Sequence, residues 1–121
     1  MPRLSPSSAG AIYLDKRRRI EDLRQAARRA EARVPLISRV ILFGSLVSGT
    51  PTPRSDADML VVVTRSQHAR AADRVPEVLH AMAPLPCPVD LFVITADELE
   101  RAQREQSPLV REALGTGLDL V

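Results

Sequence analysis

The sequence is poor in aromatic residues, with two Phe, one Tyr and no Trp among 121 residues. A core must therefore be built from Val, Leu, Ile and Ala, and the stacking platforms typical of single-stranded nucleic acid binding are not expected. No apolar run approaches the roughly 20 residues that cross a bilayer, and the first ten residues contain no apolar signal-peptide region. The only cysteine, Cys87, cannot form an internal disulfide and is interpreted as a buried thiol. These absences predict a soluble, cytoplasmic protein without a membrane partner.

Positive charge is concentrated in the first third of the chain, although the formal net charge is only +2. Residues 1–40 hold ten basic and four acidic side chains, whereas residues 41–121 hold seven basic and eleven acidic ones. The densest part is the run KRRR at residues 16–19. It can form a solvated helix face, or an electrostatic surface for an acidic partner or a polyphosphate. A basic run alone is weak support for nucleic-acid binding, which we do not expect.

Apolar periodicity predicts one α+β domain over residues 15–121, after a Pro- and Ser-rich leader at residues 1–14 that we expect to be disordered. The predicted fold is a small mixed β-sheet with helices packed on it. Helical spacing covers residues 15–34. Strands are expected at 39–43, 58–64 and 89–94, with a short final strand in the closing LDLV. Further helices are expected over 69–82, with a kink or restart at Pro76, after the Thr95/Glu98 capping box, and after Ser107-Pro108.

The stretch VILFGSLVSGTPTPRSDADMLVVV, residues 40–63, places polar groups between two apolar strands. Asp56 and Asp58 are two residues apart, so their side chains point to the same side of an extended chain. Two carboxylates this close stay ionised together only if cations lie between them. Such hard oxygen ligands suit Mg²⁺, which usually binds one or two carboxylates and the phosphates of a substrate.

A third carboxylate, Asp90, lies inside the apolar strand PVDLFVIT. If this strand neighbours the one after Asp58, the three aspartates can face one site and hold two metal ions for in-line displacement at phosphorus. Alone, Asp90 can equally be a strand-end residue paired with an arginine. His68 and His80 are alternative bases by residue type only, because both lie in or near a predicted helix.

Gly44-Ser45 follows the first predicted strand and is expected to begin a tight turn or short helix. Glycine allows the backbone to approach a phosphate closely, and the N–H groups of the turn and the Ser45 hydroxyl can donate hydrogen bonds to phosphate oxygens. Arg54, in the following connection, can add positive charge to the ligand or remain a solvated loop residue. A Gly-Ser turn is common, so it supports this interpretation only together with the aspartates.

Three features resemble the minimal nucleotidyltransferase (MNT) group of the polymerase-β-like superfamily: Gly44-Ser45, an Asp56-Ala57-Asp58 motif separated from it by ten residues, and an aspartate in the next strand. The hydrophobic ending of the SDAD motif and the closing REALGTGLDLV are similar as well. The resemblance implies a polymerase-β-like nucleotidyltransferase core over residues 15–121. It also implies that Gly44 and Ser45 bind the triphosphate of ATP. Asp56, Asp58 and Asp90 would then be the catalytic residues and the ligands of two Mg²⁺ ions.

Stand-alone proteins of the MNT type resemble antitoxins paired with HEPN-domain RNase toxins. This resemblance implies a protein adenylyltransferase that transfers AMP from ATP to a tyrosine of a HEPN-type toxin encoded nearby. Two alternatives stay open: a small-molecule nucleotidyltransferase of the antibiotic-modifying kind, and an antitoxin that only binds its partner in a nucleotide-dependent way.

Overall fold

The computed structural model describes residues 6–49 and 56–121, with side chains described from Asp15 onward. Four strands form one sheet in the order β3-β2-β1-β4. β1 pairs antiparallel with both β2 and β4, whereas β2 and β3 are parallel. The elements in chain order are α1 (Pro6–Arg33), β1 (Ile37–Phe43), α2 (Ser45–Ser48), β2 (Ala57–Val63), the 3₁₀ helix η1 (Ala71–Arg74), α3 (Val75–Met82), β3 (Val89–Thr95), α4 (Ala96–Arg104), α5 (Pro108–Thr116) and β4 (Leu118–Asp119).

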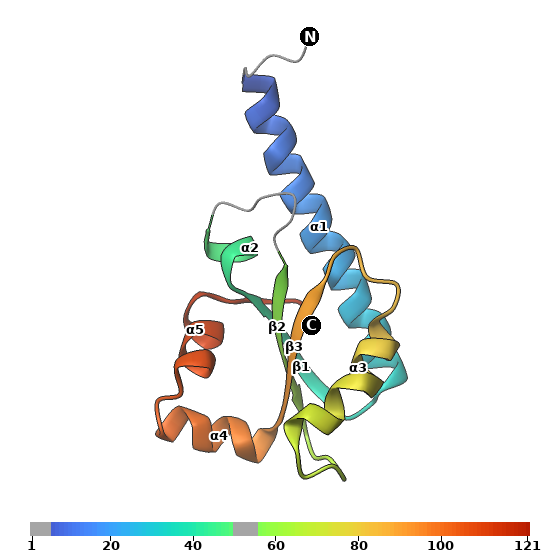
Figure 1. Ribbon diagram of the computed structural model, residues 1–121, viewed down its shortest axis with the longest axis vertical. Coiled ribbons are helices and arrows are strands. Elements are labelled where there is room, and N and C mark those ends of the chain that lie inside the picture. Colours follow the sequence, from blue (N-terminus) through green and yellow to red (C-terminus); the bar gives the residue numbers. More distant parts are fainter. Residues whose placement is uncertain (1–5, 50–55) are drawn as a thin grey trace.

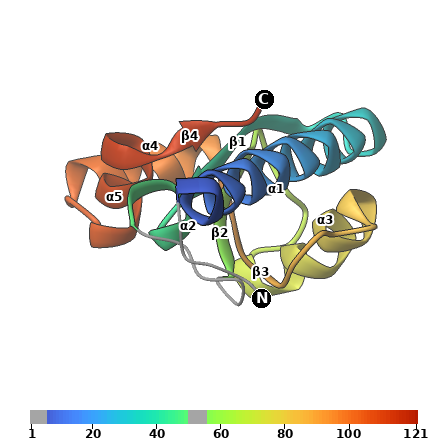
Figure 2. The same cartoon turned by 90° about the horizontal axis from the view of Figure 1, so that it is seen from above.

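Helices cover both faces of this sheet (Figures 1 and 2). On one face, α1 and α3 pack against alternate residues of β1 and β2, with Leu23, Leu42 and Met59 fully buried. On the other face, α4 and α5 pack over a smaller cluster that includes Phe43 and Leu60. Because side chains alternate along a strand, odd-numbered residues of β2 face α1 and even-numbered residues face α5.

The predicted fold class is confirmed: a small mixed sheet is covered by helices, and each predicted strand is present within two residues of its expected start. Pro76 stands in the first turn of α3, which η1 precedes, so the chain restarts a helix there. Helix α1 differs from the prediction, because it begins at Pro6 rather than at Asp15. Proline is compatible with the first helical turn, where its missing N–H is not needed. The described part of the expected leader, residues 6–14, therefore continues α1, and residues 1–5 lie outside the described part.

Several arginines of α1 bind backbone carbonyl groups, a role that the charge pattern did not predict. The guanidinium of Arg29 donates to the carbonyls of Met82 at 2.9 Å and Pro84 at 2.6 Å, and Arg33 donates to the carbonyl of Ala81 at 3.1 Å. The last carbonyls of a helix have no partner within it, so these contacts cap α3. This part of α1 is therefore neither simply solvated nor free for a partner.

Arg74 is the one buried charged residue among those described, with 5% of its surface exposed. Its guanidinium donates to both carboxylate oxygens of Glu98 and to the carbonyls of His68, Ala69 and Val93. Its hydrogen bonds hold the pKa of Glu98 below the usual value. Glu98 also completes the predicted capping box with Thr95, so this ion pair ties β3 to both flanking helices. Within the described parts of the chain, no helix is long and apolar enough to cross a membrane.

Candidate active site

Gly44 turns the chain from β1 into the short helix α2, as predicted for the Gly-Ser pair. Its φ of +86° is a conformation that residues with a side chain rarely adopt. A Cβ atom at this position would lie 2.3 Å from Oδ2 of Asp58. Two features therefore require glycine at this position: the backbone angle, and the Asp58 carboxylate that lies against it. The next residue, Ser45, is exposed and begins α2.

Asp58 and Asp90 are neighbours on adjacent strands. In the parallel pairing of β2 and β3, Asp58 lies opposite Asp90, and in the pairing of β1 and β2 it lies opposite Phe43. Residues opposite each other in a sheet project from the same face. The sheet thus carries one row of side chains, Phe43, Asp58 and Asp90, on the face that α4 and α5 cover. Gly44 is the residue that follows Phe43 in the chain.

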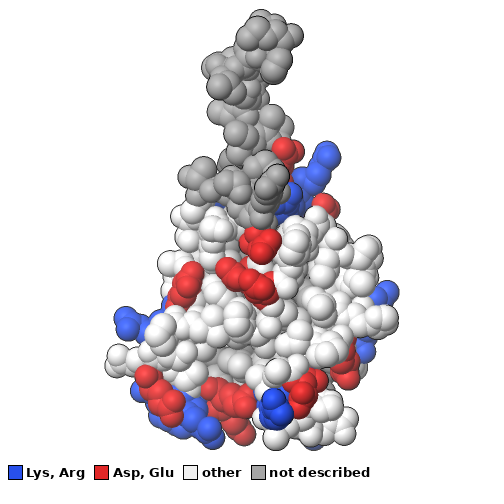
Figure 3. All heavy atoms as spheres, in the orientation of Figure 1, with Lys and Arg blue, Asp and Glu red and all other residues white. Residues whose placement is uncertain are grey.

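Glu112 of α5 adds negative charge near this row. The pKa of Asp58 is raised, first by burial and then by the negative charges of Asp90, Glu112 and Asp56. Figure 3, in the orientation of Figure 1, shows acidic side chains gathered in the upper middle of the face that is in view. A site with this much negative charge disfavours the charged form of Asp58 and favours a bound cation.

The carboxylates suit a divalent metal ion that is completed by a substrate. Among the residues that the structure describes, no three His, Cys, Asp or Glu side chains are placed to hold a metal by themselves. Mg²⁺ does not require such a set, because it commonly binds one or two carboxylates, phosphate oxygens and water. Asp58 and Asp90 provide two adjacent carboxylates, and the close approach of Gly44 leaves the Asp58 oxygen beside the turn that is predicted to bind phosphate.

The structure therefore brings together three of the five residues predicted for the site, Gly44, Asp58 and Asp90, and places Ser45 next to them in the chain. Asp56 is exposed and precedes β2, and its effect on Asp58 is the weakest of the three acidic neighbours. The catalytic and metal-binding roles of these residues stay predictions. Arg54 lies outside the described residues.

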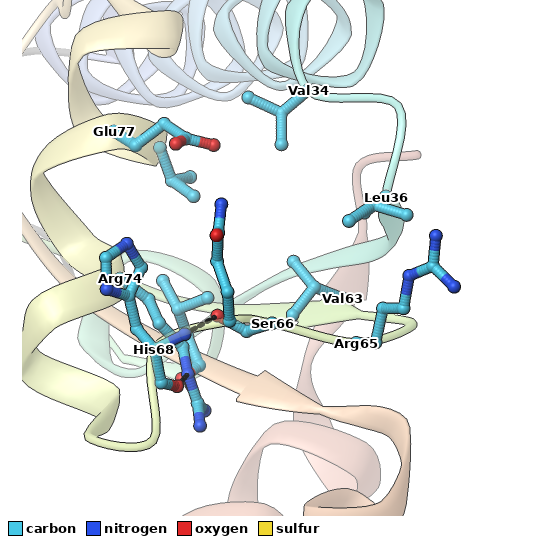
Figure 4. Close-up of a pocket in the computed structure, with 11 residues that line it drawn as sticks. Val34, Leu36, Val63, Arg65, Ser66, His68, Arg74 and Glu77 are labelled. Atoms are coloured by element: carbon cyan, nitrogen blue, oxygen red, sulfur yellow. Dashed lines mark hydrogen bonds between the residues drawn. The ribbon is translucent and has the colours of Figure 1, made fainter.

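The two histidines lie apart from this row. His80 is exposed on α3, and His68 is exposed on the segment after β2. His68 lines a cavity of about 70 Å³ that also contains Leu36, Glu77 and Arg74 (Figure 4). Val63 of this cavity is five residues from Asp58, roughly 17 Å along the strand. The cavity is too small for a nucleotide, since small-molecule sites measure about 300–1,000 Å³.

Two residues near the site were not singled out from the sequence. Glu112 lies on α5, which packs on the sheet face that carries Asp58, and this is a tertiary contact that no local sequence pattern indicated. Phe92 is two residues after Asp90, and its ring centroid lies 6.2 Å from that of Phe43. Phe92 is 37% exposed. Its position two residues after Asp90, on the same side of an extended strand, was visible in the sequence, whereas its exposure was not.

Comparisons with known proteins agree with this geometry. The sequence pattern described as "Nucleotidyltransferase domain" matches residues 23–117. The fold is similar to the crystal structure of a candidate nucleotidyltransferase from Sulfolobus solfataricus, with a TM-score of 0.61 and 22% identity over 74% of this chain and 78% of that chain. At this identity the structural likeness shows a shared fold. A comparison with curated proteins found no significant match.

Proposed function

The chain belongs to the nucleotidyltransferase domain family, and from that premise we propose that it transfers AMP from ATP to a tyrosine hydroxyl of a partner protein. Nucleotidyl transfer is the activity of the family, whose members generally use a nucleoside triphosphate and a divalent metal ion. The nucleotide, the protein acceptor and the tyrosine are our proposal. The observation that carries it is the row formed by Asp58 and Asp90, with Gly44 against the Asp58 carboxylate.

Asp58 and Asp90 would hold the metal ion, with Asp56 at the exposed edge of the site. When bound, the metal ion neutralises the triphosphate and makes phosphorus more electrophilic. Gly44 admits the phosphate chain, and the Ser45 hydroxyl and the N–H groups at the start of α2 donate hydrogen bonds to its oxygens. Charge stabilisation and positioning by these groups account for most of the expected catalysis.

Asp90 is exposed on the edge strand β3, where an acceptor can reach its carboxylate. Asp90 accepts the proton of the tyrosine hydroxyl. The hydroxyl oxygen then forms a bond to the α-phosphorus, and the bond from this phosphorus to the bridging oxygen breaks. AMP remains on the tyrosine, and pyrophosphate leaves.

The exposure of the site suits a protein acceptor. Asp90 is exposed on the edge strand β3, so an acceptor does not have to enter an enclosed cavity to reach it. A folded partner can bring its own surface to an open site. The resemblance to MNT antitoxins suggests that this partner is a HEPN-type RNase toxin encoded nearby, which would be inactivated by the added AMP.

The proposal is tested by incubating the chain with ATP labelled at the α-phosphate, Mg²⁺ and the purified product of the adjacent gene. We expect label on one protein tyrosine, and loss of at least 10²-fold of the transfer rate in Asp90→Asn, whose substitution preserves the volume of the side chain. Gly115→Ala on the solvent side of α5 is a matched control that should retain activity, since nothing lies within 4 Å of its added Cβ.

Other outcomes would replace this proposal. Label on an aminoglycoside but on no protein would show a small-molecule transferase. If Asp90→Asn abolishes transfer but still neutralises the partner, binding is the main mechanism of an antitoxin.

A further inference from the structure

We propose that the outer edge of β3 at Val89–Leu91 binds the acceptor as an additional extended strand, and that Phe92 contacts its tyrosine ring. This inference rests on the proposed function and names how the acceptor reaches Asp90. Backbone groups of β3 that face away from β2 support it.

β3 is an edge strand, and its backbone groups alternate between the two sides. The carbonyl of Pro88 accepts a hydrogen bond from the N–H of Ala57 at 3.0 Å, so residue 88 faces β2. The carbonyl of Val93 is bound by Arg74 at 3.2 Å and the N–H of Thr95 by Glu98 at 2.8 Å, both outside the sheet ladder. Successive residues of a strand alternate in direction, so Val89, Leu91 and Val93 direct their N–H and C=O groups outward.

Side chains bind several backbone groups elsewhere along the sheet edges. At the far edge, Arg24 donates to the carbonyls of Asp119 and Leu120 at 3.2 Å. On β3, Arg74 donates a hydrogen bond to the carbonyl of Val93. Beyond the ladder with β2, no described residue bonds to the backbone of Val89 or Leu91. Proteins usually protect unpaired strand edges, so open backbone groups at the two residues that flank Asp90 favour a binding function.

The side chains at this opening suit a tyrosine. Asp90 and Phe92 project from the same face, and an added strand would place one of its residues opposite Phe92. Residues opposite each other without direct hydrogen bonds have Cα atoms about 4.5 Å apart, so their side chains are in contact. Asp90 is two residues from Phe92, about 6.7 Å along the strand. This is roughly the distance from the Cβ atom of a tyrosine to its hydroxyl oxygen. A tyrosine ring packed on Phe92 can therefore place its hydroxyl oxygen at Asp90.

A second copy of this chain fits the edge less well than an acceptor. Pairing of two β3 edges would bring the acidic rows of both copies close together, and like charges across strands are unfavourable. At the start of the edge the positive charge of Arg19 outweighs the negative charge of Asp56: burial raises the pKa of the Cys87 thiol, Arg19 lowers it, and Asp56 raises it more weakly. An acceptor strand that carries acidic residues at this end would therefore be favoured.

The test removes the outward N–H of Leu91. Leu91→Pro eliminates this donor, and proline is tolerated on an edge strand where the N–H faces away from the sheet. Leu91→Ala is the matched control, because it shortens the side chain and keeps the N–H. With the product of the adjacent gene as acceptor, we expect Leu91→Pro to raise the acceptor KM about five- to tenfold relative to Leu91→Ala, the effect of one lost hydrogen bond. Phe92→Leu should raise the acceptor KM about threefold or more, whereas the KM for ATP should stay within twofold in all three variants.

Hydrogen exchange on the wild-type chain gives a second readout that does not depend on whether Leu91→Pro folds. Binding of the acceptor should slow exchange of the Leu91 and Val89 amides. Transfer by the wild type with unchanged exchange at these amides, or with equal acceptor KM in the Leu91 variants, would overturn edge docking and leave the proposed function intact. A dimer without acceptor that Leu91→Pro dissociates would also overturn it. Absence of transfer to any protein would overturn the proposed function and this inference together.

Discussion

Replacing Gly44 with alanine perturbs the site and the backbone at one position. The added Cβ would lie 2.3 Å from Oδ2 of Asp58, far inside contact distance. The carboxylate is the end of a side chain and can rotate away, so the clash is relieved by moving Asp58 rather than the strand. The backbone strain stays, because φ of +86° with ψ of −159° is a region that only glycine occupies readily.

The two effects have different magnitudes and different assays. The backbone term costs about 1–3 kcal/mol, so we expect Gly44→Ala to lower the Tm by roughly 5–10 °C. Displacing a catalytic carboxylate by about 1 Å can cost about 10²-fold in rate, so we expect transfer to fall by at least that factor at temperatures where the variant is folded. Differential scanning calorimetry and the labelled-ATP assay measure the two effects separately.

Gly115→Ala provides the control for glycine replacement itself. Gly115 is within α5, has open space around its Cβ position and no positive φ. Alanine is favoured over glycine inside a helix by about 1 kcal/mol, so this variant should be slightly more stable and fully active. A Gly44→Ala protein with the Tm and rate of the wild type would refute the claim that Gly44 and Asp58 touch.

Three further predictions concern charge and capping. Asp58→Asn should raise the Tm without metal or nucleotide, because the raised pKa of Asp58 means that its charge is unfavourable in the folded state; an unchanged or lower Tm would contradict this. Glu98→Gln should lower the free energy of unfolding at pH 7 by about 1–2 kcal/mol. This value already allows for the weaker ion pair that the partial exposure of Glu98 causes. Because Arg74 lowers the pKa of Glu98, the stabilisation by the ion pair is lost as the pH falls through that lowered pKa. The Tm values of wild type and Glu98→Gln should therefore converge in acid. A Tm difference that stays constant with pH would exclude the ion pair as the cause. Thr95→Ala should cost about 1 kcal/mol in urea unfolding through the lost N-cap of α4, and no loss would contradict the capping box.

The sequence predicted the strands well because each is a short run of β-branched or aliphatic residues between clear breaks. The alternation of side chains on β2 and β3 also placed Asp58 and Asp90 on one face, provided that the strands were neighbours. Strand order is a tertiary property, so the pairing of Asp58 with Asp90 became known only from the structure.

Other features could not be read from local patterns. The start of α1 was placed too late, because a Pro- and Ser-rich segment resembles a leader even where proline fits a first helical turn. The arginines of α1 were interpreted as surface charge, although Arg29 and Arg33 bind carbonyls that are 48 to 55 residues away in the chain. The burial of Arg74 could not be predicted from the sequence either, because the groups that bind it become its neighbours only after folding.

We propose that one metal–nucleotide complex is bound by the carboxylates of Asp58 and Asp90 together with the turn at Gly44. Isothermal titration with Mg²⁺ and an ATP analogue that cannot be cleaved after the α-phosphate measures this directly. We predict one binding site on the wild-type chain, metal-dependent and weakened at least tenfold by Asp58→Asn and by Asp90→Asn, while Gly115→Ala binds as the wild type does. Equal affinity in the wild type and both aspartate variants, or binding that is unaffected by removal of the metal, would contradict the account.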